Sequence, residues 1–224
     1  MDDLRLVGLR GQQGEGPVTG QIERKSHGHS RVPALAAALA AVLSLASPAV
    51  SRADTDPAVQ RIQTLDDGLF AAARAHDLRS AKVRQLLDQA FNLPIMAQFA
   101  VGPSWATLSA TDRAGVLEAL SRYTEARYAY EFRDFDTQTV VIDPVVQVRG
   151  LDRLVRAEIR ATGEAPVKIG YRLREYGGAW RIIDVIYNGV SQLATQRADF
   201  AASLQKGGAA ALIRSLDQST AKLK

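Results

Sequence analysis

A single acidic residue, Asp184, interrupts the apolar stretch Trp180-Arg181-Ile182-Ile183-Asp184-Val185-Ile186-Tyr187. A carboxyl group in such a stretch could act as a general base or as a structural anchor. A base would need a partner acid, and Tyr128 or Tyr171 could supply it in a reaction of the ketosteroid-isomerase type. The sequence shows no second acid at a suggestive spacing. An NTF2-like enzyme that uses Asp184 with a tyrosine is for this reason the less favoured, alternative function.

Other common catalytic groups are scarce. The chain has no cysteine, which excludes a disulfide scaffold, a thiolate nucleophile and a cysteine-ligated metal site. Two of its three histidines, His27 and His29, lie in an N-terminal segment that we expect to be removed. A Ser-His-Asp triad would need His76, which we interpret as a solvated residue in a loop after a helix. We therefore expect no catalytic residue, no metal and no cofactor.

The first 53 residues resemble an export signal. A basic patch precedes an uncharged run rich in Ala, Leu and Val over residues 32–50, and small residues follow it, which suits cleavage after Ser51 or Ala53. The run contains prolines and barely reaches the roughly 20 apolar residues of a spanning helix, so a membrane anchor is the less favoured alternative. We expect residues 1–53 to be an extension and signal peptide that is removed, and residues 54–224 to form one exported, soluble domain.

Charge argues against a nucleic-acid partner. The chain has 28 Lys and Arg against 24 Asp and Glu, a formal net charge of +4, and the part after residue 53 is nearly neutral. Nucleic-acid binding typically requires a basic stripe or patch. Four arginines that cluster in the sequence could contact a lipid headgroup or a protein partner, or could form a solvated strand face: Arg149, Arg153, Arg156 and Arg160.

Hydrophobic periodicity predicts helices in the first half of this domain, over residues 58–75 and 81–91. Pro94 interrupts the second helix, and a short apolar segment follows over residues 95–101. The longest helix is predicted over residues 109–132. It begins with a capping-box-like pair, Ser109 and Asp112, and carries an aromatic-rich side.

A β-rich region follows. Four strands are predicted over residues 137–148, 154–160, 167–175 and 180–187, and short connections indicate an antiparallel meander. In the last strand we expect Ile183, Val185 and Tyr187 to face opposite to Trp180, Ile182 and Ile186. A helix that begins at Ser191 should stop at Gly207-Gly208, and a final helix should cover residues 209–222. The predicted fold is α+β: N-terminal helices, a four-stranded antiparallel meander sheet and C-terminal helices, NTF2-like in general shape, around an apolar cavity.

Several motifs occur in an order that resembles the toluene-tolerance/MlaC family of periplasmic lipid-binding proteins. They are Trp180–Val185 followed by Gly189-Val190-Ser191, then Arg197–Phe200, Gly207-Gly208 and Leu212-Ile213, with Ala100–Trp105 upstream and Tyr171 in the preceding strand. The resemblance covers essentially residues 58–220. It extends to the hopanoid-associated, HpnM-like branch. Tyr187-Asn188 departs from the family pattern, which often has an acid or small residue there.

The resemblance implies a soluble periplasmic carrier that catalyses nothing and shuttles a lipid, a phospholipid or a hopanoid, between the inner and outer membranes. The implied partners are an inner-membrane ABC transporter with an MCE-type protein and an outer-membrane lipoprotein complex. Hopanoid systems use an RND-type exporter instead.

A lipid carrier needs an apolar cavity, because buried methylene groups would hold the lipid tails. Eleven residues are candidates to line it, although each could instead pack as ordinary core: Phe91, Ile95, Met96, Phe99, Leu117, Tyr128, Ile159, Ile169, Tyr171, Trp180 and Ile182.

Asp184 would then be a structural anchor of this cavity. A buried carboxylate requires partners, which backbone N–H groups near Gly189 and Ser191, or the guanidinium of Arg197, could supply. We expect Asp184 to tie the last strand to the C-terminal helices.

Overall fold

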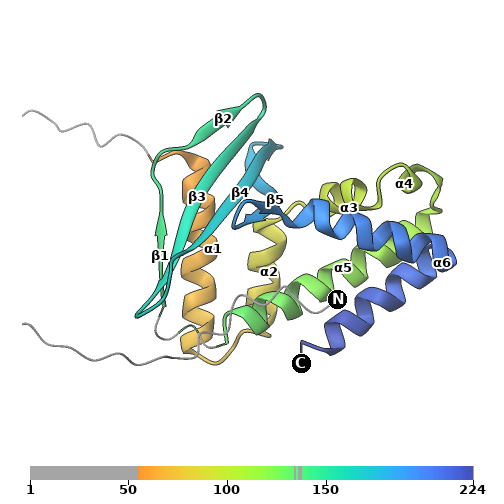
Figure 1. The fold of residues 1–224 in the computed structure, drawn as a ribbon, viewed down its shortest axis with the longest axis horizontal. Coiled ribbons are helices and arrows are strands. Elements are labelled where there is room, and N and C mark those ends of the chain that lie inside the picture. The colour runs from red at the N-terminus through yellow and green to blue at the C-terminus, as the bar shows by residue number, and fades with distance from the viewer. Residues whose placement is uncertain (1–54, 134, 136–137, 224) are drawn as a thin grey trace, which may run out of the picture. The chain divides into compact units, whose positions relative to one another are not determined.

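The computed structural model describes residues 55–133, 135 and 138–223 (Figure 1). The predicted signal peptide and the predicted domain boundary after residue 53 lie outside these residues. Within the described ranges, no helix is long and apolar enough to cross a membrane.

The first two helices are α1 (Pro57–Arg74) and α2 (Ala81–Ala90), close to the predicted ranges. Each begins at a side chain that accepts a hydrogen bond from a free backbone N–H of the first turn. The carboxylate of Asp56 accepts from Ala58 N at 2.8 Å, and the hydroxyl of Ser80 accepts from the backbone of α2 at 3.4 Å.

The apolar segment after Pro94 is a helix of its own, α3 (Leu93–Val101), followed by the short α4 (Ser104–Thr107). Proline is well tolerated in the first turn of a helix, where its missing N–H costs nothing. The side chain of Asn92 caps α3 by accepting from Ile95 N at 3.3 Å. Pro94 therefore lies in the first turn of α3, and the extended residue Phe91 separates that helix from α2.

Helix α5 (Ala110–Glu131) matches the predicted long helix. The hydroxyl of Ser109 accepts from Asp112 N at 3.0 Å and donates to the Asp112 carboxylate at 2.7 Å, which confirms the predicted helix start. Helix α6 (Gln192–Ala221) breaks at Gly207 and Gly208, as the sequence predicts. Gly208 has φ +62°, in the left-handed region that glycine adopts readily.

The antiparallel sheet has six strands, not the predicted four: β1 (Gln138–Ile142), β2 (Gln147–Arg149), β3 (Asp152–Ala161), β4 (Val167–Tyr176), β5 (Ala179–Tyr187) and β6 (Val190–Ser191). The order is β1-β3-β4-β5-β6, and β2 also pairs with β3. The predicted strand over residues 137–148 is divided around Pro144, because proline cannot donate to a strand ladder. The two-residue β6 is too short to give a pattern in the sequence.

A β-bulge in β5 reverses the predicted facing of its residues. Arg172 pairs with Asp184 whereas Leu173 pairs with Ile182, so Ile183 is an extra residue between the two pairs. One inserted residue shifts the alternation of side chains along the rest of the strand. Val185 and Tyr187 therefore share a face with Ile182, and the prediction that they oppose Ile182 is wrong.

Figure 1 shows α1 and α2 lying against the sheet, while α3, α5 and α6 pack on one another beside β5. One core of buried side chains joins these parts and includes Ile62, Leu69, Leu173, Ile182 and Leu212. The helices and the sheet leave an apolar space between them.

Candidate functional site

A cavity of about 210 Å³ lies among α1, α5, the sheet and the first turns of α6. Most of its wall is apolar or aromatic: Phe91, Met96, Tyr128, Phe132, Phe135, Val140, Ile159, Ile169, Tyr171, Val185, Tyr187 and Leu193. Its polar residues come mainly from α5 and α6: Tyr123, Thr124, Arg127, Glu131, Gln192, Thr195, Gln196 and Asp199. Asp66 of α1 also lines it.

Aromatic rings build the helical side of the cavity. Phe91 is fixed against β5, because Asn92 N donates to Ile182 O at 2.9 Å. Its ring meets Tyr128 edge to face at 5.5 Å, and Phe132 stacks on Phe135 at 4.5 Å. Such contacts stabilise large side chains in defined orientations. This wall is therefore built of mutually supporting rings.

The sheet supplies the opposite wall. Tyr171 pairs with Val185, and Ile169 pairs with Tyr187, across β4 and β5. The bulge at Ile183 brings Val185 and Tyr187 to this face. Alternation in the sequence placed them on the other face, so the sequence analysis missed both.

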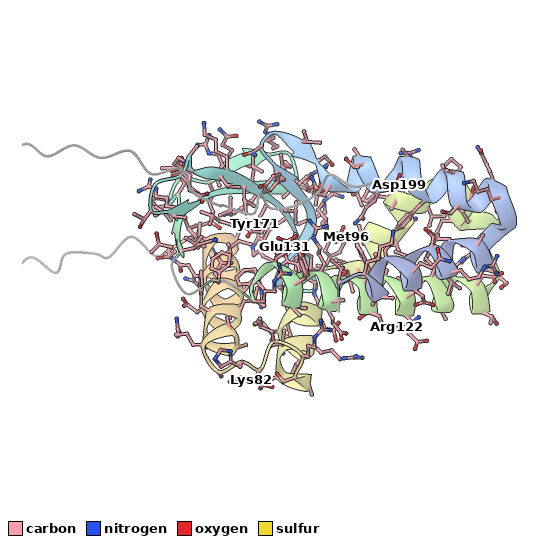
Figure 2. The ribbon with its side chains drawn as sticks, turned by 60° about the horizontal axis from the view of Figure 1, so that its bottom comes forward. Lys82, Met96, Arg122, Glu131, Tyr171 and Asp199 are labelled. Atoms are coloured by element: carbon pink, nitrogen blue, oxygen red, sulfur yellow. The ribbon has the colours of Figure 1, made fainter. Side chains whose placement is uncertain are left out.

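Polar residues lie in two parts of the cavity wall. One group, Gln192, Thr195, Gln196 and Asp199, belongs to the start of α6, and the pair of Arg127 and Glu131 belongs to the last turns of α5. Figure 2 shows Asp199 on α6, well separated from Tyr171, with Met96 between them. Arg127 pairs with Glu131 at 2.6 Å, Nε to Oε1. Burial raises the pKa of Glu131, and the charge and hydrogen bond of Arg127 oppose that rise. The cavity thus has a polar end near α6, whereas the part near the sheet is mostly apolar but includes Glu131, which lies near Tyr171 (Figure 2).

Asp66 of α1 is a further acidic residue of the cavity wall. Asp66 is only 4% exposed, and its Oδ2 atom has no hydrogen-bond partner among the residues that the structure describes. Burial raises its pKa to about 7, and the charge of Asp67 adds to the rise. Burial, and then the Asp66 charge, raise the pKa values of Tyr128 and Tyr171.

Asp66 is not among the residues predicted to line the cavity, although the sequence contains a signal for its burial. Asp66 follows Ile62 by four residues and precedes Leu69 by three, so it falls on the apolar face predicted for this helix. An acid on such a face is expected to be buried.

Asp184 lies outside the cavity lining. Its Oδ2 accepts from the Ser191 hydroxyl at 2.7 Å, and its Oδ1 accepts from Leu193 N at 3.1 Å. Ser191 also caps α6, since its hydroxyl accepts from Ala194 N at 3.0 Å. The carboxylate thus contacts the start of α6. Tyr128 and Tyr171 line the cavity without Asp184, so the structure does not assemble the predicted acid–base pair.

The other two residues of the expected anchor, Gly189 and Arg197, have different positions. Gly189 forms the turn between β5 and β6 with φ +86°. The guanidinium of Arg197 lies beside Gly102, at the end of α3, and not at Asp184. Arg197 is therefore not the partner that the sequence analysis offered as one possibility.

Comparison with known proteins now decides the family, because the MlaC protein family matches residues 58–218. The chain belongs to the MlaC family. A similar solved structure is that of the phospholipid-binding protein from Ralstonia solanacearum in complex with a phospholipid. Its TM-score is 0.64 at 25% sequence identity, and the match covers 74% of this chain and 98% of that one. A comparison with curated protein sequences gives no match.

In this MlaC-family protein, six of the eleven expected lining residues do face the cavity: Phe91, Met96, Tyr128, Ile159, Ile169 and Tyr171. Five do not: Ile95, Phe99, Leu117, Trp180 and Ile182. Ile182 is fully buried in the core, where it pairs with Leu173 on one side and with Phe91 on the other. Phe99 is 46% exposed, and the Trp180 ring is covered by the guanidinium of Arg153 at 4.6 Å.

The arginines of β3 in this MlaC-family chain are engaged in ion pairs. Arg153 pairs with Asp56, Arg156 with Asp143 at 3.2 Å, and Arg160 with Glu158 at 2.9 Å. These contacts favour the interpretation of a solvated, paired strand face. No group of three or more His, Cys, Asp or Glu that could hold a metal occurs within the described ranges.

Proposed function

We propose that this protein is a periplasmic carrier that binds one phospholipid, with its acyl chains in the cavity, and moves it between the inner and outer membranes. The observation that supports this most strongly is the cavity itself, mostly apolar or aromatic with polar residues at the start of α6, in an MlaC-family chain. A similar protein of known structure holds a phospholipid. Each methylene transferred from water contributes about 0.8 kcal/mol, so apolar contact alone would hold the acyl chains.

The cavity has to widen to accept such a lipid. Its volume of about 210 Å³ is below the roughly 300–1,000 Å³ typical of pockets for drug-sized ligands. We infer that the helical and sheet walls move apart on loading and close again when the lipid leaves.

The proposed partners follow from the family. An inner-membrane ABC transporter with an MCE-type protein would exchange lipid with the carrier, and an outer-membrane lipoprotein complex would do so at the other membrane. The hopanoid alternative, with an RND-type exporter, predicts a different bound lipid. Neither comparison points to a hopanoid, and chemical identification of the bound lipid separates the two.

An enzyme of the ketosteroid-isomerase type would now have to use Asp66, not Asp184. A carboxyl with a pKa of about 7 beside Tyr128 and Tyr171 has the required groups. The carrier is favoured because the similar protein of known structure binds a phospholipid. The replacement Asp66→Leu separates them: it would abolish turnover by such an enzyme, whereas a carrier with this replacement would still transfer phospholipid.

Filling the cavity should block loading. Val185→Phe adds a ring to the sheet wall, beside Tyr171 of the neighbouring strand. It is expected to reduce transfer of dioleoyl phosphatidylcholine between vesicles severalfold. The matched control is Val141→Phe on β1, because Val141 is 42% exposed and does not line the cavity. Transfer at the wild-type rate by a folded Val185→Phe variant would contradict the proposed location of the lipid.

A further inference from the structure

Asp66 places a carboxyl group in the cavity wall, where a purely hydrocarbon ligand would offer it no hydrogen-bond partner. It lies in the cavity wall, its residue is 4% exposed, and its Oδ2 has no hydrogen-bond partner in the part of the chain that the structure describes. A buried polar atom left without a partner is destabilising. A ligand group that hydrogen-bonds to this oxygen would remove that cost.

The surroundings of Asp66 are otherwise aromatic and apolar. Two phenols line the same cavity, Tyr128 from α5 and Tyr171 from β4. Burial raises the pKa of both phenols, and the charge of the Asp66 carboxylate adds to that rise. Arg127, the cation of the cavity wall, is paired with Glu131 on its own helix. Asp66 and the two phenols therefore form a small polar group in a wall that is mostly apolar or aromatic.

We propose that Asp66, together with the phenols of Tyr128 and Tyr171, forms a subsite that binds a hydroxyl group on the hydrocarbon part of the lipid. This inference rests on the proposed function, because it assumes that acyl chains enter the cavity. The subsite would make the protein prefer lipids with a hydroxylated chain, which membership of the MlaC family does not predict.

A hydroxyl fits this subsite better than other lipid groups do. It can donate to an ionised carboxylate and can accept from a protonated one, so it suits Asp66 in both states. The raised pKa of Asp66 means that both states are populated near neutral pH. A carbonyl can only accept, and a methylene would leave Oδ2 unpaired.

The test uses two phosphatidylcholines that differ only in hydroxyl groups on their chains. Vesicles containing equal amounts of dioleoyl and diricinoleoyl phosphatidylcholine are incubated with the protein, and the bound lipids are extracted and compared by mass spectrometry. We expect the wild-type protein to enrich the hydroxylated lipid about tenfold, the gain from one additional hydrogen bond. Asp66→Leu should lose this enrichment, whereas the control Asp67→Leu, at an exposed neighbouring position, should retain it.

A second variant covers the case in which Asp66→Leu does not fold. Tyr171→Phe removes one phenol and keeps the ring, and it should reduce the enrichment. Equal recovery of both lipids from the wild-type protein, or the same enrichment in Asp66→Leu, would overturn the subsite. Recovery of neither lipid would reject the proposed function, and the subsite with it.

Discussion

Replacing Asp184 by alanine is expected to lower the free energy of unfolding by about 4 kcal/mol. The residue is only 5% exposed, and its carboxylate accepts hydrogen bonds from Ser191 and from the backbone of Leu193. Hydrogen bonds to charged groups contribute about 1.5–3 kcal/mol each, and the two donors at the start of α6 would be left without their partner. Urea denaturation followed by circular dichroism measures the change.

Two further variants make the Asp184 result interpretable. Asp184→Asn keeps one acceptor oxygen and should fall between alanine and the wild type. Asp88→Ala, at an exposed acid of α2, should change stability by less than about 0.5 kcal/mol. If Asp184→Ala abolished lipid transfer while leaving stability unchanged, Asp184 would be a functional residue and the proposed anchor would be rejected.

The second large effect concerns Asp66 and pH. Its pKa rises from 3.8 in the unfolded chain to about 7 in the folded protein. Between these values the unfolded chain loses the proton while the folded protein keeps it, so this group destabilises the fold increasingly as pH rises. The fold is therefore most stable, as far as this group is concerned, below about pH 4, where the group is protonated in both states. That advantage is lost as pH rises through about 7. The shift corresponds to about 4 kcal/mol.

Asp66→Leu removes this dependence. We expect the variant to gain about 4 kcal/mol relative to the wild type between about pH 4 and pH 8, measured by urea denaturation at each pH. The comparison with wild type matters because Asp152 acts in the opposite sense. Burial works to raise its pKa, but hydrogen bonds from Arg174 and Arg172 lower it overall. Asp88→Leu is the control at an exposed position of α2, and parallel pH profiles for Asp66→Leu and wild type would refute the prediction.

Local signals explain why much of the fold could be predicted from the sequence. Ser109 and Asp112 define a helix start through contacts three residues apart, and Gly207-Gly208 breaks α6 through backbone conformation alone. The bulge at Ile183 has no such local signal. It depends on how β5 aligns with β4, and it decides which side of the sheet Val185 and Tyr187 occupy.

The site shows the same division. Periodicity identified Tyr128 of α5 and Ile169 and Tyr171 of β4, but it also selected Leu117, which does not line the cavity. The environment of Asp66 depends on elements distant in sequence. Its position on the apolar face of α1 was visible, whereas its proximity to Tyr128 and Tyr171 arises only when α5 and β4 close over it. For Asp184, the sequence indicated two kinds of partner, the N–H groups at a helix start and the guanidinium of Arg197. Only the folded structure shows that the helix start is the partner.

Chemical analysis of the purified protein tests the central claim most directly. The full chain is expressed in bacterial cells, purified without detergent and extracted with organic solvent, and the extract is analysed by mass spectrometry. We expect a phospholipid in an amount stoichiometric with the protein. A folded protein that carries no lipid, and that neither takes up phospholipid from vesicles nor transfers it between them, would contradict the proposed carrier function.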